Sequence, residues 1–390
     1  MEEEDARKDC AKRKAAALGA SFIAEMINTS STAAVICAYE NMEQNDELQK
    51  PRGRYLRSGV LHNPRQSFWM RVWRMGDEME FFHFMSMSRS AFNDLVDLLT
   101  SYILNHPQSR DHTKASKRTS SKRIFKPRDI VAMTIRYLAS VAEYKDIQSQ
   151  FGAVLSCLRD CIELGMSAIL TLIDHPSCRV VWDRSLEHCT KAAERTNSFL
   201  DIEGVVGMLD GKKLLTLQPQ DTLSQNRDYN GWTGDVNRNL VLLWDPYGKI
   251  IDAAVNTPGN FHDSRSTLWC DIYKHVRKLP DGFKIVCDSA FATGGNLEGK
   301  ILKLKEDSLC CDEKSDHEKQ LTHLCQCSEC GNQVLVGTFR RLKTQLPTDN
   351  VKRATIMWCT ILLHNWRTEK CDRNQIKTYF DYLQEMDSVD

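Results

Sequence analysis

The chain has 390 residues, which is enough for two or three domains and a substantial core. Its 52 basic and 52 acidic residues cancel, so net charge alone favours neither a nucleic-acid partner nor a basic one. No apolar run is long enough to span a membrane, and the acidic start MEEEDARKDC is unlike a secretory signal. The 15 cysteines are therefore expected to be reduced thiols, in the nucleus or the cytoplasm.

The first part of the chain predicts helices and loops. Residues 1–66 are polar, with a helix and loose chain expected first and an extended linker after them. Residues 67–180 are expected to be mainly helical, and Ser88 or Ser90 can cap the helix of MSRSAFNDLVDLL. Between Arg110 and Asp129 eight Lys or Arg stand against two Asp, which predicts a basic loop that contacts DNA phosphates. Its central residues are Lys117, Arg118, Lys122 and Arg123.

Three helical segments follow this loop, in DIVAMTIRYLASV, EYKDIQSQFG and AVLSCLRDCIELGMSAIL. A short helix that ends at Gly152 and is followed by a further helix is the outline of a helix-turn-helix. A three-helix packing unit without DNA contact is equally consistent, because the recognition segment from Ala153 to Arg159 has few side chains suited to base edges.

From Gly204 the pattern changes to short β-type runs. They are VVGMLD, KLLTLQP, NLVLLWD, KIIDAAV and FKIVCD, with a hairpin turn predicted between Asp245 and Lys249. A helical pattern before the last run allows that strand to lie parallel to an earlier one. The expected fold is therefore α/β, with a mixed sheet flanked by helices over residues 200–380. A charged, cysteine-rich insertion is expected at about 296–328, with helices over 329–343 and 351–369.

Two of these runs end on an acid, at Asp210 and at Asp288. Asp-Gly is the strongest short signal for a hairpin, so Asp210 can be ordinary turn chemistry. If instead the two strands are parallel neighbours, both carboxylates emerge at one sheet end, where they repel each other unless a cation lies between them. Mg²⁺ prefers such oxygen ligands, and a third acid would complete a site for two ions that clamp a phosphodiester.

Four segments resemble the DDE nuclease domain of PIF/Harbinger-type transposases and their domesticated relatives: VVGMLDGKKLLTLQP, YNGW, LLWDPYGKIIDAAVNTPGNFHDSR and GFKIVCDSAF. The resemblance runs from about Gly204 to about Phe380, and the segments occur together in order, which is far more specific than any one of them. It implies a ribonuclease-H-like fold and DNA strand cleavage and transfer that depend on Mg²⁺ or Mn²⁺. It also implies Asp210 and Asp288 as the first two catalytic metal ligands.

The third acid departs from the common pattern of that family. Many members carry a glutamate three residues before the phenylalanine of an ENAFGRLK-like helix, where this chain has Val336. Another branch has an earlier acid, in a pattern like EWGMRALQGSFGRLR, and Glu329 aligns with it without a gap. Since Leu335, Phe339 and Leu342 form an apolar stripe, Glu329 lies on another helical face. The resemblance thus implies Glu329 as third catalytic and metal-binding acid, with a degenerate site as the alternative.

Other residues near these motifs allow two interpretations each. His262 and Asp263 are candidate catalysts, although a His-Asp step at a helix start is more often an N-cap with a partner on a neighbouring strand. Tyr229 and Trp232 in DYNGW can pack on the sheet or face nucleic acid, with packing favoured. The cysteine-rich segment can bind zinc or carry free thiols. Its soft ligands are Cys310, Cys311, His317, His323, Cys325, Cys327 and Cys330.

The sequence as a whole predicts a metal-dependent DNA endonuclease or transposase. Expected partners are DNA and a second copy of the chain, and the resemblance adds a separate Myb-like DNA-binding protein. The alternative is a catalytically inactive domesticated transposase that acts as a DNA-binding or protein-interaction factor. Cleavage of RNA is a further possibility that the acids alone do not distinguish.

Overall fold

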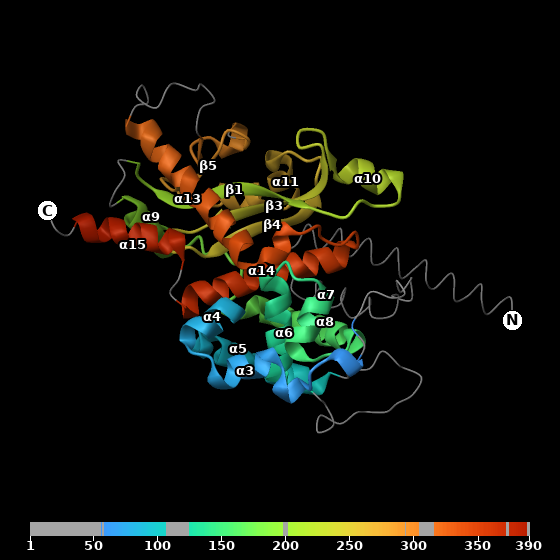
Figure 1. Cartoon of the computed structure of the whole chain (residues 1–390). Coiled ribbons are helices and arrows are strands. Elements are labelled where there is room, and N and C mark those ends of the chain that lie inside the picture. The colour runs from blue at the N-terminus through green and yellow to red at the C-terminus, as the bar shows by residue number, and fades with distance from the viewer. Residues whose placement is uncertain are drawn as a thin grey trace.

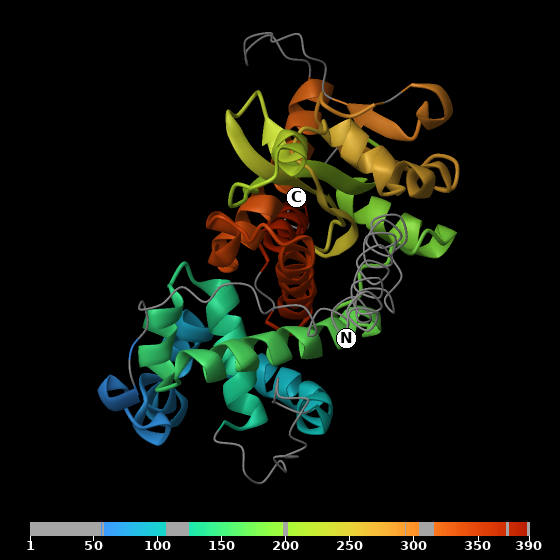
Figure 2. The same ribbon diagram turned by 90° about the vertical axis from the view of Figure 1, so that its right-hand side faces the viewer.

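The structure is a computed structural model that describes residues 56, 58–106, 125–197, 202–292, 294–303, 316–371 and 374–387. The helix expected in the first 50 residues and the four central residues of the basic loop lie outside these ranges. A helical part and a sheet part are joined through α14 (Asn350–Lys370), which runs between them in Figure 1 and in the turned view of Figure 2.

The helical part confirms the helices expected between residues 67 and 180. Ser88 caps α5 by accepting a hydrogen bond from the Ala91 amide, and α7 ends at Gly152 in the left-handed conformation. The helices are α3 (Phe68–Met75), α4 (Glu78–Met85), α5 (Arg89–Asn105), α6 (Pro127–Ala139), α7 (Tyr144–Phe151) and α8 (Leu155–Leu170). Short 3-10 turns lie at Ser58–Val60, Pro64–Gln66 and Thr171–Asp174.

An aromatic core holds these helices together. The fully buried Trp69 of α3 packs against Phe92 and Phe151, and its indole N–H donates to Asp129 at 2.9 Å, which satisfies a polar group that is costly to bury alone. Helix α8 packs on α6 and α14, and Ser156 is its one exposed residue. The helix-turn-helix role stays a prediction, and this burial leaves α8 little surface for base contacts.

The sheet is mixed, as expected. Strands follow the order β4–β3–β1–β5–β6, and β2 pairs with the start of β3. Strand β3 is antiparallel to β1 and β4, whereas β5 is parallel to β1 and β6. The bounds are β1 (Val205–Leu215), β2 (Tyr229–Asn230), β3 (Asp235–Trp244), β4 (Ile250–Pro258), β5 (Lys284–Cys287) and β6 (Ile301–Lys303).

Strand β1 does not stop at Asp210, which corrects the expectation of two separate runs. It pairs continuously with β3, with Asp210 opposite Leu242 and Gly211 opposite Val241. The ladder hydrogen bonds with β3 therefore override the turn preference of the Asp-Gly step. The hairpin predicted between Asp245 and Lys249 is confirmed, because the Asp245 amide donates to the Lys249 carbonyl at 2.9 Å and Gly248 has a positive φ.

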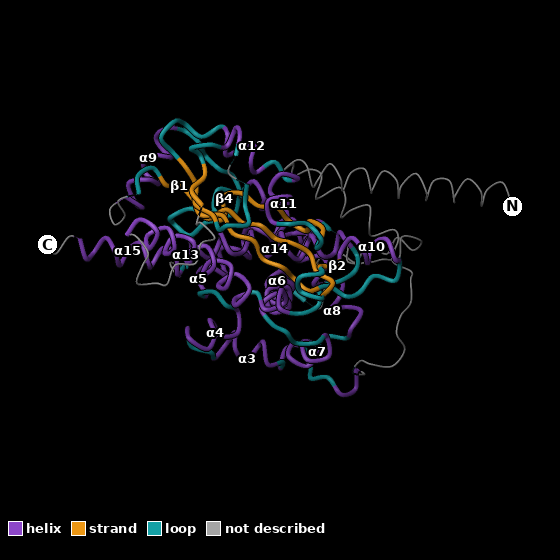
Figure 3. The backbone as a smooth tube through the Cα atoms, turned by 90° about the horizontal axis from the view of Figure 1, so that it is seen from above, coloured by secondary structure: helices purple, strands orange, loops and turns teal. Residues whose placement is uncertain are grey.

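Helices cover both faces of the sheet, and Figure 3 shows α11 and α12 on one side of the strands and α13 on the other. Helices α9 and α12 share one apolar cluster with β1 and β3, and α13 and α14 share the other. The bounds are α9 (Leu186–Asn197), α10 (Thr222–Asp228), α11 (Asp263–Trp269), α12 (Ile272–Arg277), α13 (Asp316–Thr338) and α15 (Gln375–Asp387), with 3-10 turns at Gly295–Leu297 and Arg340–Lys343. Three long strands (β1, β3 and β4) with the short β2, then helices, two further strands and a late helix that bears Glu329 form the expected ribonuclease-H-like layout.

Helix α13 differs from its prediction at both ends. It begins at Asp316 and not at Glu329, so the later half of the expected insertion is helical, and it ends at Thr338 before a 3-10 turn. The predicted stripe of Leu335, Phe339 and Leu342 is buried in the core, as expected. Among the described helices, none is long and apolar enough to cross a membrane.

Candidate functional site

Asp210, which lies within β1, and Asp288, which follows the last residue of β5, lie side by side. Strand β1 is parallel to β5 with Leu209 opposite Cys287, so Asp210 and Asp288 occupy the next pair of positions along these two strands. This confirms the predicted geometry of adjacent parallel strands. Because parallel strands point the same way, both acids lie at the end of the sheet where β5 stops.

The Asp210 carboxylate is half-buried and oriented by two hydrogen bonds. Its Oδ1 accepts from the Gly211 amide at 2.7 Å, and its Oδ2 accepts from the Asn332 side chain at 2.8 Å. Burial, together with the charges of Asp288 and Glu329, raises the pKa of Asp210 to about 7 against the two hydrogen bonds. Burial also raises the pKa of Asp288, whose Oδ1 accepts from the Ala290 amide at 2.9 Å.

Asn332 of α13 reaches Asp210 because the helix lies close to the sheet. A side chain at Gly331 would come within 2.8 Å of the Trp244 ring, so a glycine is needed where α13 crosses β3. Asn332 also accepts a hydrogen bond from the Trp244 indole at 3.3 Å, and it thereby links β3 to Asp210. Sequence reasoning missed Asn332, although it stands three residues after Glu329 and hence on the same helical face.

Glu329 is exposed on α13, about one helical turn before Asn332. Its negative charge is felt at Asp210, whereas Val336, at the position of the glutamate in many family members, is buried in the core. The chain thus brings Asp210 and Asp288 together and places Glu329 at the edge of the same site. Its role as third ligand stays a proposal.

Asp263 is a further acid at this site. Its Oδ1 is buried and has no hydrogen-bond partner among the described residues. A side chain at Gly211 would lie 2.5 Å from the Asp263 Cγ, so the glycine beside Asp210 makes room for this carboxylate. Burial and the charge of Asp288 raise the pKa of Asp263. The Asn239 side chain fixes the preceding loop by donating to the Phe261 carbonyl at 2.7 Å.

The N-cap interpretation of His262 and Asp263 is confirmed for the position of His262, but not for a capping hydrogen bond. His262 is the N-cap residue of α11, but its side chain makes no capping hydrogen bond, and it is exposed. The His262 and Lys303 side chains lie near Asp288, and Lys213 lies near Asp263, where each lowers the pKa of the neighbouring acid. Basic groups therefore border the buried acids.

Carboxylate oxygens and one orphaned buried acceptor are a donor set that suits a hard divalent cation such as Mg²⁺. Within the described ranges, however, no three His, Cys, Asp or Glu side chains form a group that could hold one ion together. The same finding gives no support to zinc at His317, His323 and the α13 cysteines, and Cys310 and Cys311 lie outside the described residues. The described cysteines form no disulfide with one another, as expected.

The expectation that Trp232 packs on the sheet is wrong. Trp232 is 94% exposed and Tyr229 is 47% exposed. The turn that joins β2 to β3 lies between the paired residues Asn230 and Asp235, and all four of its residues are exposed.

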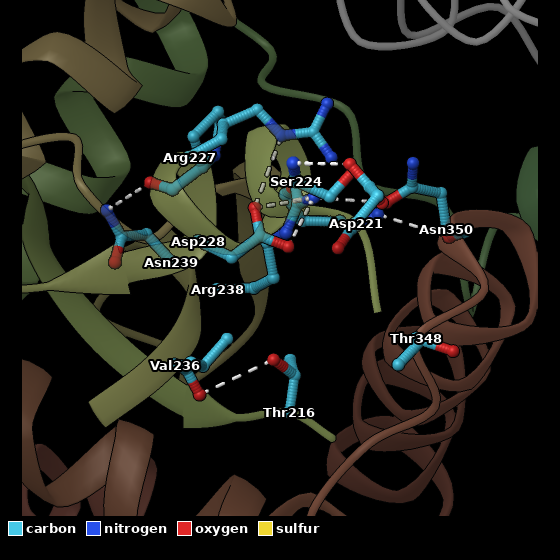
Figure 4. Close-up of polar contacts among 12 residues, drawn as sticks. Thr216, Asp221, Ser224, Arg227, Asp228, Val236, Arg238, Asn239, Thr348 and Asn350 are labelled. Atoms are coloured by element: carbon cyan, nitrogen blue, oxygen red, sulfur yellow. Dashed lines mark hydrogen bonds and ion pairs between the residues drawn. The ribbon is translucent and has the colours of Figure 1, made fainter. Parts of the chain in front are cut away.

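A second polar cluster lies where β3 begins and β4 ends. The buried Asp228 of α10 accepts from Arg238 of β3 at 2.8 Å and from Arg227 at 3.2 Å. Arg238 also donates to the side-chain oxygen of Asn350 in α14 at 3.2 Å (Figure 4). Arg353 is fully buried and donates to Asn256 and to the Pro347 carbonyl, both at 2.6 Å. Burial and the charge of Arg238 lower the pKa of Arg353 to about 9. This cluster ties α10 and α14 to the sheet.

Comparison with known proteins agrees with the geometry of the acids. Residues 209–365 match the family model of the DDE superfamily endonuclease, a range that includes Asp210, Asp263, Asp288 and Glu329. Searches of curated proteins and of solved structures found no match. Residues 209–365 of this chain are therefore a DDE superfamily endonuclease domain.

Proposed function

We propose that this protein is a metal-dependent DNA endonuclease of the Harbinger transposase type, or a domesticated descendant of one. The observation that carries the proposal is the parallel pairing of β1 with β5, which sets Asp210 beside Asp288 inside a DDE endonuclease domain. DNA, a second copy of the chain and a Myb-like protein are the proposed partners, and the nucleus is the proposed compartment.

Asp210, Asp288 and Glu329 would hold divalent ions, with Asp263 as a neighbouring acid. Such ions, when bound, polarise a phosphodiester and make water or a DNA 3′-hydroxyl a better nucleophile. The residues of the chain supply orientation. Gly211 and Asn332 fix both oxygens of Asp210, and the Ala290 amide fixes Asp288. Lys213, His262 and Lys303 are placed to attract the phosphates on either side of the cleaved bond.

Cleavage of labelled DNA with Mg²⁺ or Mn²⁺ tests this proposal. We expect the wild type to cleave, and we expect Asp210→Asn and Glu329→Gln to abolish cleavage while the melting temperature does not fall. Asp252→Asn is the matched control, because Asp252 is a buried acid of the same sheet that pairs with His275 at 2.6 Å, away from the site. A Glu329→Gln variant that cleaves like the wild type would show that the third acid is elsewhere.

The second candidate function is a DNA-binding or partner-binding protein that keeps the fold without the chemistry. It is favoured by the separation of Glu329 from the two aspartates, since no three-residue group that could hold a metal is formed by the described side chains. A wild type that binds DNA, but neither binds Mg²⁺ at millimolar concentration nor cleaves, would select this function.

A further inference from the structure

A single large aromatic side chain projects from the loop between β2 and β3. Trp232 is 94% exposed, and its neighbours Gly231, Thr233 and Gly234 are small and also exposed. A Cβ atom added at Gly231 or Gly234 would meet no atom within 4 Å, so there is free space on either side of Trp232 in the loop. An exposed indole ring presents a flat apolar face on which a nucleic-acid base can stack.

The loop that carries Trp232 is held in a fixed shape. The Asn230 side-chain oxygen accepts from the amides of Trp232 and Thr233 at 3.0 and 3.2 Å, and its nitrogen donates to the Gly259 carbonyl at 2.7 Å. Asn237 of β3 donates to the Thr233 hydroxyl at 3.0 Å. A partner would therefore meet a backbone that is already ordered, which lowers the entropic cost of binding.

The register of the sheet gives the separation of this loop from the acids. Asp210 lies opposite Leu242 on β3, and Asn230 lies opposite Asp235, seven residues earlier on the same strand. At about 3.4 Å per residue this places the base of the Trp232 loop roughly 24 Å along the strand from Asp210. Consecutive nucleotides of one strand of duplex DNA are also about 3.4 Å apart along the helix axis, so the separation corresponds to about seven nucleotides of stacked DNA and to fewer of an extended single strand.

Positive charge lies along this path. Lys212 and Lys213 of β1 are opposite Leu240 and Asn239, between the level of the acids and the level of the loop. At the loop itself the exposed charge is the acid Asp235. Phosphate attraction therefore weakens where Trp232 begins, and contact with a base face is the interaction that an indole can supply there.

We propose that Trp232 stacks on an unpaired or unstacked base of the DNA substrate, about seven nucleotides from the phosphodiester that faces Asp210 and Asp288. This inference rests on the proposed DNA function. Stacking on Trp232 would add a second contact with the DNA, independent of its sequence, and would orient the strand that the acids bind. Helix α10, which leads into β2, lies on the opposite side of the sheet part from α9 in Figure 1.

Binding of a fluorescein-labelled single strand of about 30 nucleotides, and of its duplex, tests the contact without metal, so that no cleavage occurs. We expect Trp232→Ala to weaken single-strand binding by about tenfold to a hundredfold, and duplex binding less, because duplex bases are already stacked. Trp232→Phe should restore most of the affinity. The salt dependence should keep its slope in Trp232→Ala, since stacking releases no counterions, whereas Lys212→Ala should make the slope shallower.

Leu223→Ala is the matched control. Leu223 of α10 is 83% exposed and apolar but has no aromatic face, so this variant should bind DNA like the wild type. Sedimentation tests whether this surface instead joins two copies of the chain. If Leu223→Ala and Trp232→Ala both convert a dimer to a monomer, and both lose DNA affinity to the same extent, the stacking inference is wrong. It is also wrong if wild type binds DNA and Trp232→Ala matches it, a result that leaves the proposed nuclease function intact. If the wild type binds neither the single strand nor the duplex, both the stacking inference and the proposed DNA function are wrong.

Discussion

Two polar clusters on the same sheet differ in how their charges are satisfied. In the arginine cluster the carboxylate of Asp228 has ion pairs to Arg227 and Arg238, and Arg353 donates to oxygens of four residues. In the acid cluster Asp210, Asp263 and Asp288 form no ion pair with any described residue, and one Asp263 oxygen has no partner in the described ranges. Only four positions of β3 separate Arg238 from Leu242, the residue opposite Asp210.

The difference separates a structural role from a functional one. A buried charge with an opposite charge beside it stabilises the fold, or at least does not oppose it, even though the Arg238 Nε has no hydrogen-bond partner in the described ranges. Half-buried like charges without a counter-ion lower stability. Proteins keep such an unfavourable arrangement where activity needs it. The contrast can be tested because changes in the two clusters are expected to act on stability with opposite sign.

The largest effect is expected from Asp228→Asn. The change leaves the buried guanidinium of Arg238 without its carboxylate, so the free energy of unfolding should fall by roughly 3–5 kcal/mol. Urea denaturation measures this. Asp221→Asn at the other end of α10 is the control, because Asp221 is an exposed N-cap and asparagine caps equally well. A loss below about 1 kcal/mol for Asp228→Asn would show that the arginine cluster is not a structural tie.

The reverse sign is expected for Asp210→Asn. Because the folded state raises the pKa of Asp210 from 3.8 to about 7, folded protein binds more protons than unfolded protein between these values. The unfolding free energy of the metal-free wild type should then be highest near pH 4 and should fall as the pH rises to about 7. Asp210→Asn should flatten this dependence and, at pH 8, should be more stable than wild type by at least about 1 kcal/mol. A destabilised Asp210→Asn would place Asp210 among the structural residues.

Magnesium should remove the repulsion that lowers stability in the acid cluster. If the dissociation constant is about 1 mM, then about 10 mM Mg²⁺ should raise the unfolding free energy of wild type by roughly 1.4 kcal/mol, and a chelator should reverse the gain. The gain should vanish in Asp210→Asn and in Asp288→Asn and persist in Asp221→Asn. Equal gains in all four proteins would mean that Mg²⁺ acts elsewhere on the chain.

The parts of the fold that local patterns determine could be predicted from the sequence. Ser88 as a cap and Gly152 as a helix end depend on a few neighbouring residues, and the pairing of Asp210 with Asp288 follows from two apolar runs with a helical crossover between them. The family resemblance to a DDE endonuclease is confirmed over residues 209–365, whereas the Harbinger type stays a proposal.

The parts that depend on distant partners were not predictable. The continuity of β1 through Asp210 requires pairing with β3, and the contact from Asn332 to Asp210 joins residues 122 positions apart. The start of α13 at Asp316 lies in charged residues without apolar periodicity, so its first turns carry no helical signal. Packing was the favoured interpretation of Trp232 because aromatic residues usually pack, and no local pattern reveals that its side chain is exposed.

The smallest expected effect tests whether Asp263 belongs to the acid cluster. A methyl group at Gly211 would lie 2.5 Å from the Asp263 Cγ, so Gly211→Ala must displace this carboxylate or distort β1. In an Asp263→Ala background the clash is absent, and Gly211→Ala should then cost less. The double-mutant cycle, measured by urea denaturation, should give a coupling of about 1 kcal/mol. Ser264→Ala, one residue further along α11, should show no coupling to Gly211. If Asp263 also shows none, its carboxylate is not held against β1. The half-buried like charges then reduce to Asp210 and Asp288, and the contrast with the arginine cluster depends on this pair alone.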